Sequence, residues 1–191
     1  MSTLPKTVSA GSADKARLLA LLRQSRKLFL DSFADVGNEQ SRRRPAEGAW
    51  SVLDTVEHLT VAEKAMLRIV TGARRPRPAD APNREEIFLR AAADRSRKLE
   101  SPDAACPRGR FANLTVAAAE FSEARDALIA FVEQSGEDLR ATEVAHPHPL
   151  VGKVSSYEMV IIMAKHAERH ALQIEEIKNS PAFRGNAKAR G

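Results

Sequence analysis

Apolar residues recur every three or four positions in four long stretches of this chain, and no stretch alternates apolar and polar residues at a convincing strand length. Glycine and proline separate the stretches. Helices of roughly 20 residues would be about 30 Å long, which suits side-by-side packing. We therefore predict an all-α fold, a four-helix bundle with crossover connections and a short extra helix. The bundle helices are expected over 13–36, 51–71, 115–134 and 157–178, and the extra helix over 83–99.

A single domain accounts for the chain. Its 191 residues, 43% of them hydrophobic, can bury a sizeable core. Residues 1–12 are polar and contain Pro5 and Gly11, so we expect a disordered lead. Residues 179–191 read as a basic mobile tail, which leaves 13–178 as the bundle domain.

The composition argues against several classes of protein. No apolar run is long enough to cross a bilayer, the N-terminus lacks the apolar core of a signal peptide, and Cys106 is the sole cysteine. We therefore expect a cytoplasmic protein without disulfides that does not bind membranes. The net charge of +5 lies partly in the tail, in Arg42–Arg44 and in Arg74–Arg77, without interleaved aromatic residues. This pattern does not favour nucleic acid, so we expect a small-molecule substrate.

Two histidines lie on the apolar side of the last predicted helix. Counting by three and four from Met159 reaches His166 and His170. Imidazoles at positions i and i+4 share one helix face and can bind one metal ion. Ala167 stands where the zinc proteases place a catalytic Glu, so a metalloprotease is not expected. Two hydrogen-bonded core histidines would give the same pattern.

A third histidine strengthens the metal interpretation. His58 lies in the middle of the second predicted helix, on or near its apolar face. Three histidines from two facing helices would leave at least one coordination position open, as in catalytic sites. Asp54, one turn earlier, could orient His58, but it fits better as part of the helix cap begun by Ser51.

Other polar residues are weaker candidates. His146 and His148, in the stiff loop HPHP, compete as ligands but are expected to be exposed or, at most, to contact substrate. Glu63 and Glu168 could act as general bases, although exposed helix positions are the simpler interpretation. Cationic residues near the end of the bundle, Lys153 and Arg42–Arg44, could meet carboxylates of a cofactor.

Two segments together resemble the DinB-like family. GAWSVLDTVEHLTVAE, from Gly48 to Glu63, is similar to that family's Trp-Ser segment with a His-Leu pair. HPHPLVGKVSSYEMVIIMAKHAERHALQIEEI, from His146 to Ile177, is similar to its final loop and helix, where His-x-x-x-His precedes Gln-Ile. The order of elements agrees as well, over about residues 13–178.

The resemblance implies a four-helix bundle with a site for a divalent metal, zinc or nickel, bound by His58, His166 and His170. It also implies a homodimer. The family shares its fold with enzymes that use mycothiol or bacillithiol, so the resemblance implies thiol-dependent transfer.

Three neutral imidazoles would leave a divalent ion its full charge, and such an ion deprotonates a bound thiol or lowers the pKa of water to about 7. Our first hypothesis is therefore a metal-dependent thiol S-transferase that uses a low-molecular-weight thiol. We do not assign the thiol to Cys106, which lies in a proline-rich loop. The alternatives are a metal-dependent hydrolase and a non-catalytic, metal-binding helical dimer.

Overall fold

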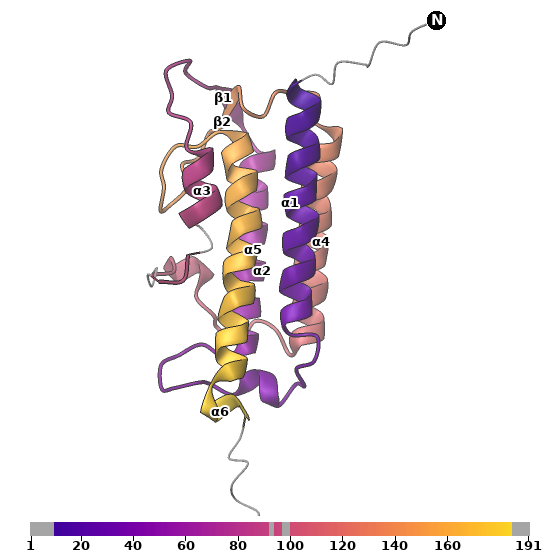
Figure 1. Ribbon diagram of the computed structural model, residues 1–191, viewed down its shortest axis with the longest axis vertical. Helices are drawn as coiled ribbons and strands as arrows, with labels where there is room; N and C mark the ends of the chain where they lie inside the picture. Colours follow the sequence, from indigo (N-terminus) through magenta and orange to yellow (C-terminus); the bar gives the residue numbers. More distant parts are fainter. Residues whose placement is uncertain (1–9, 92–93, 97–99, 185–191) are drawn as a thin grey trace, which may run out of the picture.

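The computed structural model describes residues 10–91, 94–96 and 100–184, and it confirms the predicted four-helix bundle (Figure 1). Within these residues, no helix combines the length and apolar character needed to span a bilayer. The long helices are α1 (Ala10–Ser32), α2 (Val52–Thr71), α4 (Leu114–Gln134) and α5 (Ser156–Asn179), and the short elements are η1 (Gln40–Arg42), β1 (Arg74–Pro76), α3 (Glu85–Ala91), η2 (Asp103–Ala105), β2 (Thr142–Val144) and α6 (Pro181–Arg184).

Each long helix contacts two others. Helix α1 packs on α4 and α5, and α2 packs on the same two helices from the other side. Helices α2 and α4 run in the same direction, so the chain between them must return along the length of the bundle (Figure 1). That crossover contains β1, α3 and η2. Its last part reaches α2 near the middle of the helix, which places loop backbone beside His58.

Local signals in the sequence fix the starts of α2 and α5. The Ser51 hydroxyl accepts the Asp54 amide at 3.1 Å, and the Asp54 carboxylate accepts the Ser51 amide at 2.9 Å. Ser155 and Glu158 repeat this reciprocal arrangement at the start of α5. Such caps stabilise a helix by about 1 kcal/mol. The cap role predicted for Asp54 is confirmed.

The apolar core consists of two clusters along the bundle. One contains Leu22 and Leu128, and the other contains Phe29 and Phe121, all fully buried. A buried side chain of this size stabilises the fold by roughly 1.5–3 kcal/mol. Between the two clusters lies a polar layer of buried side chains from three helices: Ser25, Glu63 and Arg125.

The extra helix is shorter than predicted. The predicted helix over 83–99 ends at Ala91, and residues 94–96 are not helical. There the backbone crosses towards α5, where Arg169 donates to the Asp94 carbonyl and Arg95 pairs with Glu176 at 2.6 Å. Residues 92–93 and 97–99 lie outside the described part of the chain.

A small antiparallel sheet was not expected. Arg74–Pro76 pairs with Thr142–Val144, and Arg75 lies opposite Glu143, with which it forms an ion pair at 3.0 Å. Three residues are too few for a periodic pattern to be visible in the sequence. This sheet ties the crossover to the end of the bundle where α5 begins.

The predicted ends of the domain also shift. Residues 10–12 belong to α1, so the expected lead is shorter, and residues 1–9 are not described. The prediction of a mobile tail from residue 179 onwards is wrong for residues 181–184. They form α6, and Phe183 is buried in the core. Residues 185–191 lie outside the described chain.

Candidate metal centre

His58 from α2 and His166 and His170 from α5 converge inside the bundle. Their potential ligand atoms lie within 4.8 Å of one another, and these residues form a group that can hold a metal ion. The Nε2 atom of His166 lies 3.4 Å from that of His58 and 2.9 Å from that of His170. Three nitrogens around a tetrahedral zinc-type ion would be separated by about 3.3 Å, given bonds of roughly 2.0–2.1 Å. The two printed separations lie near this value and the third is below 4.8 Å, so the donor set fits such an ion with small side-chain adjustments.

Hydrogen bonds on the opposite ring atoms orient two of these imidazoles. The Nδ1 atom of His58 lies 2.9 Å from the Ala105 carbonyl oxygen, and that of His170 lies 2.8 Å from Oε1 of Gln173. Both oxygens can only accept, so each Nδ1 must carry the ring proton. In the neutral rings, Nε2 of His58 and of His170 then presents a lone pair to the common centre.

His166 differs from its two neighbours. Its Nδ1 is buried and has no hydrogen-bond partner within residues 10–91, 94–96 and 100–184, and its Nε2 faces the other two Nε2 atoms. Lone pairs facing one another at these separations repel unless a proton or a cation lies between them. A proton on Nε2 of His166 can be donated to one of the two other Nε2 atoms, which leaves the remaining Nε2 lone pair and Nδ1 of His166 without a donor among the described residues, and this is unusual for structural core histidines.

Burial keeps all three rings neutral. Desolvation lowers the pKa of His58, although its hydrogen bond to Ala105 opposes this effect. Desolvation lowers the pKa of His166 and of His170 well below the usual value, and the neighbouring histidines lower it further because like charges repel. Neutral imidazole is the form that binds a metal ion.

Two further groups shape the space around His58. The Trp50 ring, directly before the α2 cap, lies with its centroid 4.8 Å from that of His58. Trp50 thus packs at the entrance of α2 and also contacts the histidine cluster. On the other side, the connection between α3 and α4 supplies Ala105, and the Ser101 hydroxyl lies 3.3 Å from Nδ1 of His58.

The competing histidines do not join the cluster. His146 is exposed, and His148 is partly buried with its Nδ1 accepting the Leu150 amide at 3.2 Å. Neither belongs to the group of potential ligands. Cys106 is partly buried, and its thiol lies 3.9 Å from the Ser101 carbonyl oxygen.

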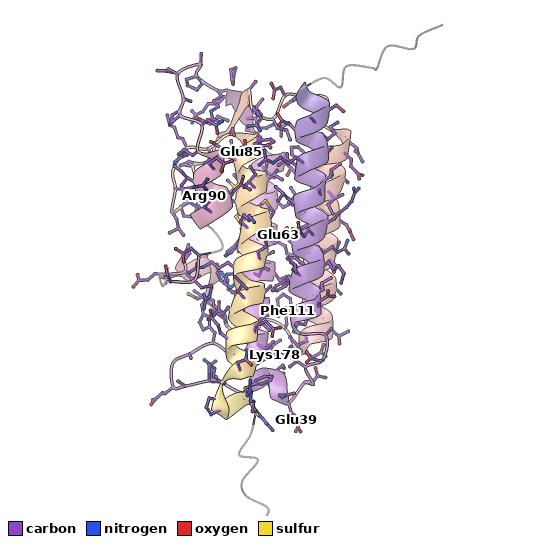
Figure 2. All side chains as sticks on the ribbon, in the orientation of Figure 1. Glu39, Glu63, Glu85, Arg90, Phe111 and Lys178 are labelled. Atoms are coloured by element: carbon purple, nitrogen blue, oxygen red, sulfur yellow. The ribbon has the colours of Figure 1, made fainter. Side chains whose placement is uncertain are left out.

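The two candidate bases have other roles. Glu63 is fully buried and pairs with Arg125 at 2.6 Å, so the expectation that it would be exposed is wrong. It faces the bundle interior midway along the helices (Figure 2). Glu168 is partly buried and pairs with Lys165 at 2.6 Å.

The predicted cofactor-binding cations are also engaged elsewhere. Arg42 donates to the Ala112 carbonyl, Arg43 lies 3.4 Å from that of Phe183, and Arg44 pairs with Asp54 at 2.9 Å. Lys153 lines a separate hollow of about 400 Å³ beside the start of α5. None of these contacts brings the cations to the histidine cluster.

Three residues around the site were not predicted from the sequence: Glu57, Ala105 and Gln173. Glu57 is buried beside His58 although it is charged, and a carboxylate at an inward-facing helix position was a detectable signal. Gln173 follows His170 by three positions, the spacing of a side-chain contact on one helix face. Ala105 acts through its backbone, so its side chain carries no signal.

Fold and site together define a class, the helical bundles with a crossover and three inward-facing histidines from two neighbouring helices. A family model described as the DinB superfamily matches residues 21–174, so this chain belongs to that superfamily. The resemblance found in the two sequence segments is thereby confirmed.

One solved structure extends the comparison. The chain is similar to YfiT from Bacillus subtilis, described as a probable metal-dependent hydrolase with an unusual four-helix bundle topology. The TM-score is 0.54 at 15% sequence identity, over 93% of this chain and 91% of that chain. At this identity the likeness shows the fold. A search of curated proteins finds no significant match.

Proposed function

We propose that this protein is a metal-dependent enzyme of the thiol S-transferase type, with His58, His166 and His170 as the ligands of a divalent ion. The observation that carries the proposal is the convergence of three Nε2 atoms at 2.9 and 3.4 Å in a buried site, with no protein group between them. A bound ion would supply Lewis acidity, which lowers the pKa of a thiol or of water at its open position.

The chain's own residues prepare the site for this chemistry. Ala105 and Gln173 hold Nδ1 protons, so that two rings present their Nε2 lone pairs inward. Burial excludes bulk water and keeps the rings uncharged. His166 is less buried than the other two, and we place the approach of a small-molecule substrate on its side of the cluster.

The nearby carboxylates are hydrogen-bonded to other groups and are not available as general bases, which favours a thiol over water as the nucleophile. Hydrolysis commonly needs a positioned acid or base that accepts a proton from water and returns it to the leaving group. Glu63 is bound to Arg125, and Glu57 binds loop amides with both oxygens. A thiol that is already ionised needs no such base to attack an electrophilic carbon.

Hydrolysis is the second candidate, and the fold shared with YfiT supports it. The two activities differ in a simple requirement. A transferase consumes a low-molecular-weight thiol and forms a thioether or thioester product, whereas a hydrolase turns over in buffer without thiol. Zinc and nickel are the proposed metals, and a homodimer is the proposed assembly.

Metal analysis of protein purified without a histidine tag tests the proposal first. We expect about one zinc or nickel ion per chain in wild type and almost none in His166→Ala, with unchanged helical circular dichroism. Absence of metal from wild type after incubation with either ion would refute the site.

Turnover is tested next with a panel of small thiols and activated electrophiles, and with ester and amide substrates in the absence of thiol. Thiol-dependent turnover that His166→Ala abolishes supports the transferase. Turnover that needs no thiol and is also abolished by His166→Ala supports the hydrolase. Stoichiometric metal without turnover on either panel would support the non-catalytic dimer, and light scattering then measures its mass.

A further inference from the structure

The crossover segment over 101–110 lies against α2 and is held there by one buried carboxylate. Oε1 of Glu57 accepts the Arg108 backbone amide at 2.6 Å, and Oε2 accepts the Arg110 amide at 3.0 Å. The Arg110 guanidinium adds a third bond at 2.7 Å. Only 1% of the Glu57 side chain is exposed, so these bonds replace its hydration.

Gly109 makes the arrangement of the two amides possible. It lies between Arg108 and Arg110 and has a φ of +73°, a conformation that side-chain-bearing residues rarely adopt. A left-handed residue between two others lets successive amides point to one side, where they form a concave site for an anion. Here that anion is the carboxylate of Glu57.

The same segment contacts His58 a few residues earlier. The Arg110 side chain donates to the Cys106 carbonyl at 2.8 Å and to the Ala104 carbonyl at 3.2 Å. These bonds fix the backbone on either side of Ala105, whose carbonyl oxygen accepts from Nδ1 of His58 at 2.9 Å. Hydrogen bonds therefore run from Glu57 through Arg110 to the two residues that flank Ala105.

Both oxygens of Glu57 point to the loop, so the carboxylate is not available as a base at the histidine cluster. We propose that Glu57 is a positioning residue: it holds the 104–110 backbone so that the Ala105 carbonyl fixes the ring proton of His58 on Nδ1 and turns Nε2 towards the other two histidines. This inference rests on the proposed metal site for its consequence, but the position of the ring proton can be measured in the metal-free protein.

The experiment is a long-range ¹H–¹⁵N correlation spectrum of the histidine rings at pH 8, recorded on metal-free protein. In wild type we expect His58 to carry its proton on Nδ1. Glu57→Gln keeps the shape but places an amide group against the donors of Arg108 and Arg110, so His58 should shift towards the Nε2–H form that free imidazole favours. Affinity for zinc, measured by competition with a chromophoric chelator, should fall about 10-fold.

Matched variants separate positioning from general loss of structure. Glu143→Gln alters another buried carboxylate paired with an arginine, away from the cluster, and should leave the His58 proton and zinc affinity unchanged. Gly109→Ala disturbs the turn without touching Glu57, since a Cβ there meets no atom within 4 Å. It should reproduce the Glu57→Gln spectrum, whereas Gly152→Ala, at another left-handed glycine with open space, should not.

An unchanged His58 tautomer in folded Glu57→Gln and Gly109→Ala proteins would overturn the proposal and leave Glu57 with a purely structural role. If Glu57→Gln does not fold, the Gly109→Ala spectrum alone decides between the two outcomes. Failure of the wild type to bind zinc would refute the proposed function instead, and the tautomer measurement would still test the role of Glu57.

Discussion

Two polar clusters lie within the same helical bundle, and they are built in opposite ways. The Glu63–Arg125 pair is fully buried, and Arg125 also donates to the Leu22 carbonyl, the Ser25 hydroxyl and the Met163 carbonyl. The histidine cluster is somewhat less buried, its inner nitrogens face one another, and Nδ1 of His166 has no partner among the described residues. The polar groups of the first cluster satisfy one another, whereas the second is a group that could hold a metal ion.

This contrast separates buried polar groups with a structural role from those that could form a binding site. Glu63 lies in the core, yet Arg125 donates to both of its carboxylate oxygens and neither side chain is exposed to solvent. Burial raises the pKa of Glu63, and the Arg125 charge opposes that rise. An incomplete cluster such as the histidines is the better indicator of a binding site.

The largest expected loss of stability comes from breaking the Glu63–Arg125 pair. Arg125→Met leaves the Glu63 carboxylate buried without a partner, so the free energy of unfolding should fall by about 3–5 kcal/mol, with or without metal. Urea denaturation followed by circular dichroism measures this loss. The double variant Glu63→Leu/Arg125→Met should recover most of it, and a loss below about 1 kcal/mol in the single variant would show that the pair is not closed to water.

A metal ion should stabilise the folded protein only by binding to the three histidines. At a free zinc concentration 100 times its dissociation constant, wild type should gain about 2.7 kcal/mol in the free energy of unfolding. His166→Ala should gain nothing, since it removes the ligand that contacts both other rings. His148→Ala serves as the control because His148 lies outside the ligand group, and equal losses in both variants would contradict the three-histidine site.

The pH dependence of the metal-free protein should come partly from the histidine cluster. The folded-state pKa values of His58, His166 and His170 lie below the usual 6.5, so the unfolded chain binds more protons as the pH falls. Stability is therefore fully present above about pH 6.5 and is lost below it, by at most about 1.4 kcal/mol per pH unit for each ring.

Denaturation of metal-free protein between pH 8 and 5 measures this slope. His166→Gln should flatten it by one group's contribution, while an identical slope in the variant would mean that the pKa of His166 is the same in the folded and unfolded states.

The smallest effect should follow from loosening one ring of the incomplete cluster. Gln173→Leu removes the acceptor for Nδ1 of His170 while leaving all three ligands in place. Zinc affinity should fall about 10-fold, close to 1.4 kcal/mol, with the stability of the metal-free protein little changed. Competition titration measures this change. Gln173→Glu keeps an acceptor and should retain the affinity, so equal weakening in both variants would contradict an orienting role.

The positions of the long helices and of their inward-facing residues follow from local patterns in the sequence. Apolar spacing gave the four long helices, and the Ser51 and Ser155 caps located two of their starts to within a residue. The same spacing placed His166 and His170 on one face, because residues four apart on a helix must share it. His58 was found for the same reason, since the period of an isolated helix already shows which side will be buried.

Only the tertiary structure decided which buried polar groups meet. Glu63 and Arg125 lie 62 positions apart, and no local pattern shows that their helices bring them together. The end of the extra helix at Ala91, the sheet of Arg74–Pro76 and Thr142–Val144, and the contact of Ala105 with His58 all depend on the path of the crossover. Backbone carbonyls and long-range pairs leave no periodic trace, because their partners are set by packing and not by neighbours in the chain.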